Sequence, residues 1–480
     1  MSDFSGNAQP SLAPAPETLL QGMSSETARH DAQAASHSPM DPQRDLPVAN
    51  EGVVLAGLLA LFLCRAIIAN AVVPPWQGPD EPGHFAVTYG LTRPTIMRVP
   101  IEAGVLRSME RDRWWALYDD LPPYPLDSFN RVYSVGGGNL AQPLYYSLGA
   151  IALGVSRPVD LETAYYHLRV LGVLLAVVAL GFGWAGTRLL FGPEVAVGAL
   201  AIGALHPQFL LASISVNADA LVNFWGAFVW WQAARVLTGH RRALSIILML
   251  VGAVAALFTK RIGMILVGVS LVVAVAPMLE NRTWRLQRRE ALLMAMVAAI
   301  CVCMLVVLGV LFREPVVVLW SYWRDAFTPR TSIADATGSE ALRFARMTVD
   351  YFWLIAGWLR FQPPSAWLWV ARILVVSGMV GALLQLIIVR TGRLSLSVAW
   401  LFVTAQVVAM FVTVFWLAPS APQARYLFPV FAPITALLYV GLRRLVPRGF
   451  EAQWPATLVV VLLMLDVTGF TTVDLQSYLP

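Results

Sequence analysis

Apolar residues form long runs, separated by short polar or arginine-rich breaks, along nearly the whole chain after residue 51. A hydrocarbon core about 30 Å thick is crossed by roughly 20 apolar residues in a helix. About eleven segments reach that length, with approximate limits 52–73, 166–190, 194–213, 219–237, 243–259, 261–278, 291–311, 366–390, 395–417, 425–445 and 455–472. Long connections at about 74–165 and 312–365 interrupt them. The pattern predicts an all-α, polytopic membrane protein with about eleven transmembrane helices.

The composition agrees with this prediction. Of the 480 residues, 58% are hydrophobic and only 13% are charged, which excludes an ordinary soluble domain. We therefore expect residues 51–480 to form one transmembrane domain. Residues 1–50 contain few large apolar side chains and are rich in Ser, Ala, Pro and acidic residues, which predicts a disordered cytoplasmic tail.

Arginine clusters predict the orientation of the spans, because short cytoplasmic loops collect basic residues. With a cytoplasmic N-terminus, the clusters within 241–242, 282–289 and 443–448 all lie in the cytoplasm, and both long connections lie outside. Residues 143–156 are apolar but too short for a comfortable crossing, and counting them as a span would move the later clusters outside. We therefore expect 143–156, and the amphipathic segment 340–361, to be interfacial helices.

Two adjacent acids follow the first predicted span, in the segment WQGPDEPGHFAVTYG at 76–90. Asp80 or Glu81 before Pro82 is an ordinary helix start, so helix capping explains them simply. Catalysis by these carboxylates is the alternative. A second acidic position, Asp219, favours that alternative, because the predicted orientation places it on the same side of the membrane as Asp80.

Asp219 itself begins the predicted span 219–237, where it or Asn217 can also cap the helix. Lys260 and Arg261 fall between two predicted spans on the outer side, against the orientation rule. Binding of a lipid phosphate explains them, and so does snorkelling of both side chains to the interface.

Arg425, followed by Tyr426, opens the span 425–445 from the same predicted side. A phosphate or sugar contact and snorkelling are again both open.

A divalent-cation site is compatible with the spacing of the first acidic motif. His84 lies three residues after Glu81 and four after Asp80, so these side chains can share a helix face, with Asp219 as a further ligand. Hard cations often bind without His, and His84 can equally orient Asp80. The residues leave metal dependence open.

The order of the motifs PDEPGHF, NLAQPLYYSL at 139–148, HPQFLLASISVNADAL at 206–221 and QARYLFP at 423–429 resembles an uncharacterised bacterial membrane family, domain of unknown function 2142. More distantly, the chain resembles the C-superfamily (GT-C) glycosyltransferases, such as oligosaccharyltransferase, protein O-mannosyltransferase and the aminoarabinose transferase of lipid A. The resemblance implies a GT-C-like fold and inverting sugar transfer from a polyprenyl-phosphate donor. It places Asp80 at the catalytic position and Asp219 at a second acidic site, which here has one acid in place of a paired motif.

The expected function is a glycosyltransferase of the bacterial inner membrane, acting at its outer face on a glycolipid or polysaccharide acceptor of the cell envelope. The alternative is a transporter, flippase or assembly factor for envelope polysaccharide precursors. Ionisable groups near the membrane midplane mark transport paths, whereas the candidate acids here lie at helix ends. The arginine clusters report topology, so we expect no nucleic-acid partner.

Overall fold

All regular elements of the described residues are helical, apart from one isolated β-bridge between Ala356 and Phe361. The computed structural model describes residues 51–93, 98–111, 114, 142–280, 324, 328, 338–389, 392–417, 423–475 and 478. The helices up to residue 280 are α2 (Glu51–Val72), α3 (Glu81–Gly90), α4 (Arg98–Arg111), α7 (Pro143–Ser156), α8 (Leu161–Phe191), α9 (Pro193–Ala204), α10 (Pro207–Ile214), α11 (Asp219–Leu237), α12 (Arg242–Thr259), η4 (Arg261–Gly263) and α13 (Met264–Glu280). The later helices are α16 (Gly338–Trp353), α17 (Ser365–Ile388), α18 (Arg393–Val412), η6 (Thr413–Leu417), η7 (Ala424–Val430), α19 (Phe431–Leu445), α20 (Trp454–Gly469) and η8 (Phe470–Leu475). The predicted all-α class is confirmed.

Seven of the described helices are long and apolar enough to cross a membrane, or eight if the bent pair α9 and α10 counts as one span. The protein is therefore a multi-pass membrane protein. Two further predicted spans are helical but do not belong to this set. Helix α13 is too short, with 17 residues, and α11, with 19 residues, is less apolar. The predicted span 291–311 and the predicted tail 1–50 lie outside the described residues, so both stay predictions.

The predicted span 194–213 is not one continuous helix. It is divided into α9 and α10, whose axes differ by 61°. Pro207 causes the break, because proline lacks a backbone N–H and its ring clashes with the preceding turn. His206 caps the second helix, since its Nδ1 accepts a hydrogen bond from the backbone N–H of Phe209 at 3.2 Å. The loop after α10 then meets the first long connection, where Val216 N donates to Glu81 Oε1 at 2.8 Å.

The two segments predicted to be interfacial are both helical. Helix α7 has the predicted bounds, whereas α16 ends at Trp353, well before the predicted residue 361. Three consecutive residues after it, Gly357, Trp358 and Leu359, have φ of 53°, 55° and 67°. An α-helix requires negative φ, so the predicted extension of this helix is wrong. Placement of α7 and α16 in the membrane interface stays a prediction.

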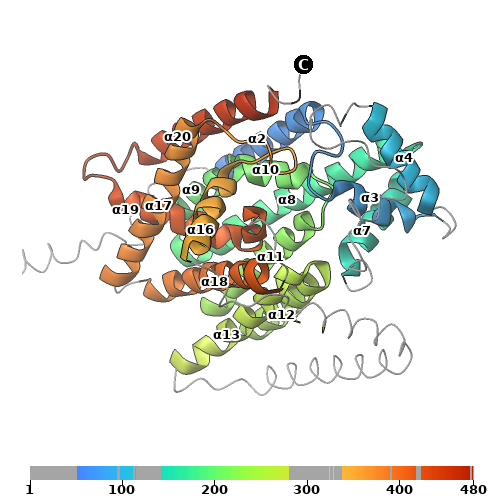
Figure 1. Ribbon diagram of the computed structural model, residues 1–480. Coiled ribbons are helices and arrows are strands. Elements are labelled where there is room, and N and C mark those ends of the chain that lie inside the picture. Colours follow the sequence, from blue (N-terminus) through green and yellow to red (C-terminus); the bar gives the residue numbers. More distant parts are fainter. Residues whose placement is uncertain are drawn as a thin grey trace, which may run out of the picture. The chain divides into compact units, whose positions relative to one another are not determined.

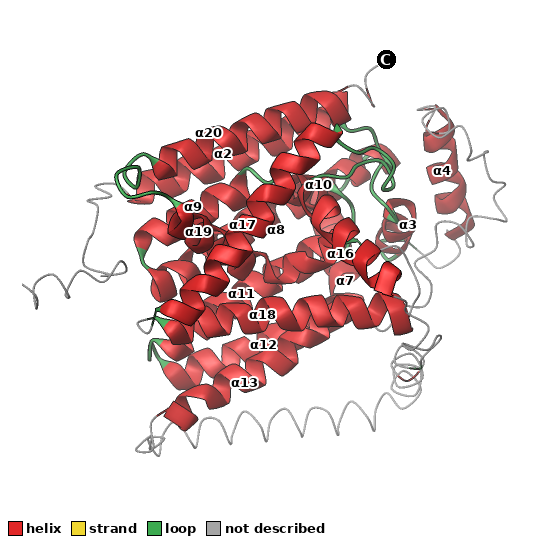
Figure 2. Ribbon diagram, turned by 60° about the vertical axis from the view of Figure 1, so that its left-hand side comes forward, coloured by secondary structure: helices red, strands yellow, loops and turns green. Residues whose placement is uncertain are grey.

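Helices α11 and α19 are inner helices of the bundle, since most of their side chains are buried, and other helices lie around them (Figures 1 and 2). Helix α11 packs against α8 and α12, and α19 packs against α17, α9 and α18. Helix α11 also contacts η7, the turn that leads into α19. Glycine allows this close approach, because a Cβ on Gly226 would lie 1.8 Å from the backbone oxygen of Pro429. The N-terminal half of α11 and the residues of η7 therefore meet.

An ion pair lies within the spans, which the hydrophobic pattern does not predict. Arg65 of α2 pairs with Asp466 of α20, and the same guanidinium donates to the backbone oxygen of Ala204 at the end of α9. Both charged side chains are only 10% exposed. A buried charge is tolerated when it is paired and hydrogen-bonded, so this contact holds α2, α9 and α20 in one arrangement.

We expect Gly226→Ala to destabilise the purified protein by about 1–3 kcal/mol, because the added methyl group overlaps Pro429 and separates α11 from η7. The matched control is Gly181→Ala in α8, where a Cβ would meet nothing within 4 Å. That change should be neutral or stabilising by up to about 1 kcal/mol. Melting temperatures in detergent test both, and equal values would contradict the close approach at Gly226.

Candidate functional site

One guanidinium joins Asp80 to Asp219. Arg425 Nη2 lies 3.1 Å from Asp80 Oδ2, and Nη1 lies 3.4 Å from Asp219 Oδ2. The Nε of Arg425 donates to Gln423 Oε1 at 2.6 Å. Because the Arg425 side chain is only 7% exposed, most of its donors are directed at groups of the protein itself. Three segments that are far apart in the sequence meet at this one side chain.

Asp219 also holds a second cation. Its Oδ1 accepts a hydrogen bond from Lys260 Nζ, and its side chain is 3% exposed. Tyr426 lies beside both cations, with its ring centroid 5.0 Å from Lys260 Nζ and 5.6 Å from Arg425 Cζ. We call Asp80, Asp219, Lys260 and Arg425 the charge cluster. With two acids and two bases, its formal charge is zero.

Helix capping does not occupy the carboxylate of either aspartate. Asp80 precedes α3, but its side chain makes no capping hydrogen bond. Its φ of 67° lies in the left-handed region, which is uncommon for residues other than glycine. At the start of α11, Asn217 supplies the cap, because its Oδ1 accepts a hydrogen bond from the backbone N–H of Asp219 at 3.0 Å. The carboxylates of Asp80 and Asp219 are therefore left to their charged partners.

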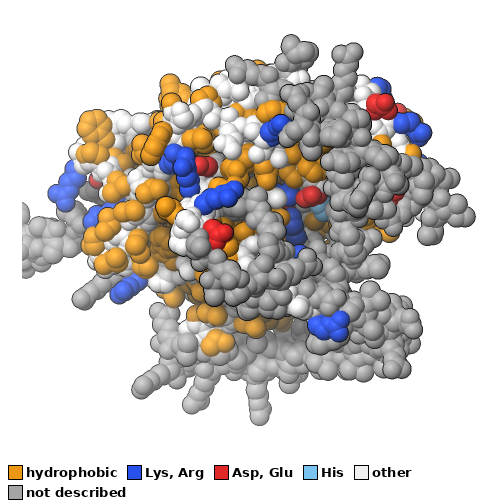
Figure 3. Space-filling view, in the orientation of Figure 1, with side chains coloured by type: hydrophobic (Ala, Val, Ile, Leu, Met, Phe, Trp, Pro, Cys, Tyr) orange, Lys and Arg blue, Asp and Glu red, His pale blue; other side chains and the backbone are white. Residues whose placement is uncertain are grey.

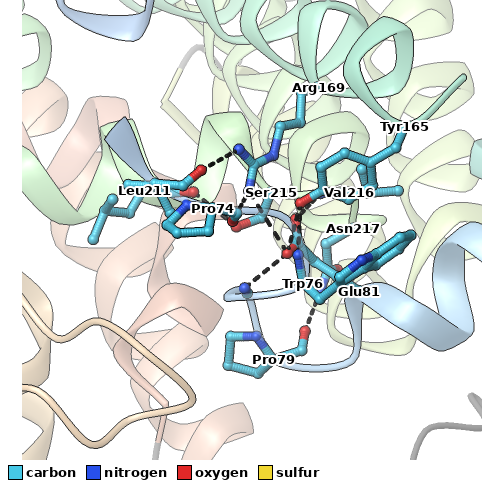
Figure 4. Close-up of polar contacts among 12 residues, drawn as sticks. Pro74, Trp76, Pro79, Glu81, Tyr165, Arg169, Leu211, Ser215, Val216 and Asn217 are labelled. Carbon is cyan, nitrogen blue, oxygen red and sulfur yellow. Dashed lines mark hydrogen bonds and ion pairs between the residues drawn. The ribbon is translucent and has the colours of Figure 1, made fainter. Parts of the chain in front are cut away.

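Glu81 has a different environment from its neighbour Asp80. Its side chain is fully buried and accepts three hydrogen bonds, from Gly78 N at 2.8 Å, Val216 N at 2.8 Å and the Tyr165 hydroxyl at 3.0 Å (Figure 4). These donors come from the loop before α3, the loop after α10, and α8. The arrangement favours a structural role for Glu81, which the adjacent positions of the two acids in the sequence do not indicate.

Arg169 balances the charge of Glu81, with 3.9 Å between its Nη2 and Glu81 Oε2. The same guanidinium donates to the backbone oxygens of Val73 at 2.8 Å and Pro74 at 2.9 Å (Figure 4). It thus ties α8 to the end of the first span. The sequence motifs did not indicate Arg169, although an arginine inside a predicted apolar span, near its outer end, breaks the orientation rule.

Two other predicted site residues have separate environments. His84 is buried, with its Nδ1 3.0 Å from the Tyr146 hydroxyl and its ring stacked on that of Tyr146. Burial lowers the pKa of His84 to about 4, so the imidazole is neutral at pH 7. Arg261 forms no ion pair within the part of the chain that the structure describes, and it is not brought into the charge cluster.

A cleft with about 660 Å³ of empty space, part of it open to solvent, is lined by Asp219 and Arg425 of the charge cluster. Its polar lining includes Asn217, Asp219, Gln208, Gln423, Arg169 and Arg425, and its apolar lining includes Leu211, Ile214, Ile355 and Leu359. A pocket of this mixed character suits a ligand that has both polar and apolar parts. On the face drawn in Figure 3, hydrophobic side chains spread widely over the described residues, and charged side chains gather in small groups.

The side chains that could hold a metal here are Asp80, Asp219 and His84. Within the described ranges, no three or more His, Cys, Asp or Glu side chains come together in a metal-binding arrangement. Both oxygens of Asp219 already face cations of the protein. This set of donors does not fit a tightly held divalent cation, which takes about six or more oxygen ligands.

No protein-family model and no curated protein matches the chain. Solved structures of an oligosaccharyltransferase from Archaeoglobus fulgidus do match. The apo form is 14% identical, with a TM-score of 0.44, over 91% of this chain and 57% of that one. The archaeal oligosaccharyltransferase AglB in complex with an inhibitory peptide and a dolichol-phosphate is 14% identical, with a TM-score of 0.42, over 88% and 56%. The complex with Zn and sulfate is 14% identical, with a TM-score of 0.40, over 70% and 44%.

The chain thus spans about half the length of the oligosaccharyltransferase chains that it matches. Membership in the family of unknown function stays a prediction, because no family model matches.

We expect Glu81→Gln to destabilise the protein by about 3–5 kcal/mol, because Arg169 loses its buried partner. In addition, whichever way the new amide turns, its NH₂ group faces a hydrogen-bond donor. The matched control is Asp80→Asn at the next position, where the side chain is 49% exposed, and we expect a change below about 1 kcal/mol. Melting temperatures in detergent measure both. A wild-type value for Glu81→Gln would refute its structural role.

We expect the stability of the protein to fall as the pH is lowered from about 6.5 towards about 4, because His84 is protonated more readily in the unfolded chain than in the folded one. Above this window the contribution is fully present, and it is lost as protons bind. The change reaches at most about 3–4 kcal/mol, since the pKa of His84 falls from 6.5 to about 4 and one pKa unit corresponds to about 1.4 kcal/mol. The difference between wild type and His84→Gln, followed by melting temperature against pH, isolates this group. Parallel curves would contradict the lowered pKa.

Proposed function

We propose that the protein is a GT-C-type glycosyltransferase, which moves a sugar from a polyprenyl-phosphate donor to a glycolipid or polysaccharide acceptor of the cell envelope. The observation that carries this proposal is the environment of Asp80. Its carboxylate caps no helix, is half-exposed, and shares Arg425 with the buried Asp219 beside a mixed polar and apolar cleft. An accessible, oriented carboxylate can act as a general base.

In the proposed reaction, Asp80 takes the proton from a hydroxyl group of the acceptor. The hydroxyl oxygen forms a bond to the anomeric carbon from the face opposite the phosphate. The bond between that carbon and the phosphate oxygen breaks, and its electron pair leaves with the phosphate. The configuration at the anomeric carbon is therefore inverted. The lipid phosphate gains one negative charge, and Asp80 loses one by protonation.

The charge cluster suits a reaction in which Asp80 loses one negative charge and the lipid phosphate gains one. Before reaction, its two acids balance its two bases, Lys260 and Arg425. Once Asp80 is protonated, the cluster carries one net positive charge at the moment when the phosphate becomes more negative. Fixed cations that act on charge formed during the reaction are an effective source of catalysis. Asp219 keeps both cations in place, and Glu81 positions the loop that carries Asp80.

We further propose that the enzyme lies in the bacterial inner membrane with this site at its outer face, as the arginine clusters predict. The ion pair Arg65–Asp466 supports a second candidate function, a transporter, flippase or assembly factor, because ionisable groups inside spans often mark transport paths. Both side chains of that pair are largely buried in the protein, however, since each is 10% exposed and Arg65 also donates to the backbone oxygen of Ala204.

We expect Asp80→Asn to reach the membrane at the wild-type level and to lower sugar transfer by about 10²–10⁴-fold, the usual contribution of a general base. Mass spectrometry of cell-envelope glycans from wild-type, deletion and Asp80→Asn strains checks this. The variant and the deletion should lack the same sugar.

The control is the double variant Arg65→Leu with Asp466→Leu, which replaces the ion pair inside the spans by apolar side chains and is expected to fold. Its glycans should match those of the wild type. Normal glycans in the Asp80→Asn strain, together with altered glycans in the double variant, would instead favour transport or assembly.

A further inference from the structure

Both carboxylate oxygens of Asp219 face cations of the protein, and Oδ2 does so without a hydrogen bond. Its Oδ1 binds Lys260 Nζ, and its Oδ2 faces Arg425 Nη1 at 3.4 Å. We propose that the Lys260 ammonium stands where a divalent metal would bind beside Asp219, and that the site works with protein cations alone. The part that concerns metal binding rests on this geometry. Its consequence for sugar transfer rests on the proposed function.

Arg425 occupies the other position at which a metal could bind, between Asp80 and Asp219. An ion shared by Asp80 and Asp219 would have to lie where the guanidinium lies, because one nitrogen of Arg425 faces each carboxylate. Mg²⁺ requires a nearly octahedral shell of oxygens at about 2.0–2.1 Å. Gln423 holds the Nε of Arg425, and the side chain is 7% exposed, so little room exists for it to move aside. A divalent ion next to two fixed cations would also be repelled.

The break between α12 and α13 places the ammonium of Lys260. Helix α12 ends at Thr259, and Lys260 is extended, with φ −158° and ψ 141°. The turn Arg261–Gly263 follows at once, and it needs glycine at its end, because a Cβ on Gly263 would lie 2.4 Å from the backbone oxygen of Ala256. The chain therefore gives Lys260 a conformation distinct from that of Arg261, and Lys260, unlike Arg261, pairs with Asp219.

Two groups hold the ammonium in its place, the carboxylate of Asp219 and the ring of Tyr426, whose centroid lies 5.0 Å away. A cation gains from both contacts, through ion pairing and through the negative face of the ring. Removing the ammonium while leaving a small hydroxyl in its place would free Asp219 Oδ1 and leave space for an ion and its water ligands. A metal site should therefore appear when Lys260 is shortened.

The test is a titration of manganese with purified full-length protein in nanodiscs, with bound Mn²⁺ measured by electron paramagnetic resonance. Wild type should bind no Mn²⁺ that depends on Asp219. Lys260→Ser should bind one ion per chain, and addition of Asp219→Asn should abolish that binding. The matched control is Arg261→Ser, which removes the neighbouring cation outside the charge cluster and should behave as wild type.

One Mn²⁺ per chain in wild type, lost in Asp219→Asn, would overturn the proposal, and this measurement does not depend on how the Lys260 variant folds. A well-folded Lys260→Ser protein without added Mn²⁺ binding would overturn the assignment of Lys260 to the metal's place. Sugar transfer should continue at an unchanged rate in EDTA, and its loss, with recovery on adding Mn²⁺, would also overturn the proposal. Absence of transfer under every condition would contradict the proposed function instead, and the manganese result would still stand.

Discussion

The contact of Arg425 with two aspartates is the interaction on which the candidate site depends. Burying a guanidinium costs several kcal/mol even after the protein relaxes, and this cost must be offset by close, oppositely charged partners. Asp80 comes from the loop before α3, Asp219 begins α11, and Arg425 lies in η7. The contact therefore joins the first long connection to the start of α11 and to η7.

A second set of contacts maintains strain in that loop. Trp76 and Asp80 both have positive φ, of 70° and 67°, and such conformations cost roughly 1–3 kcal/mol each. The backbone of Trp76 is held from two directions, since its N–H donates to the Tyr165 hydroxyl at 3.1 Å and its oxygen accepts from Trp358 Nε1 at 2.9 Å. Glu81 adds the buried hydrogen bonds described above. Strain that the surroundings enforce in this way is typical of functional loops, and here it aims Asp80 at Arg425.

The sequence predicts much of the bundle, because spans of about 20 apolar residues are a direct consequence of membrane thickness. Orientation by arginine clusters also predicts that Asp80, Asp219, Lys260 and Arg425 share one side, and the structure brings these four together. The orientation rule cannot distinguish Lys260 from Arg261, because the break after α12 sets the direction of each side chain.

Pairings across long distances in the chain are also beyond the hydrophobic pattern. Arg65 and Asp466 are 401 positions apart, and each alone would be expected to weaken its own span. Only their contact makes either residue favourable there. The same holds for Arg169, whose partner Glu81 lies in the sequence beside an acid with a different role. Pro207 alone could have predicted the bend. The apolar run is long enough for one span, however, so the hydrophobic pattern predicts one helix.

The carboxylates of Glu81, Asp219 and Asp80 are chemically alike but have different environments. These environments suit them to different roles. Glu81 is fully buried, hydrogen-bonded three times and balanced by Arg169, so it has little access to a proton from a ligand. Asp219 is buried and paired with both Lys260 and Arg425, so it has little access to a ligand. Asp80 alone combines a half-exposed carboxylate with a cationic neighbour. A group that must accept a proton from a bound molecule needs that combination of access and orientation. Of the three, Asp80 therefore best suits the role of general base in the proposed transfer.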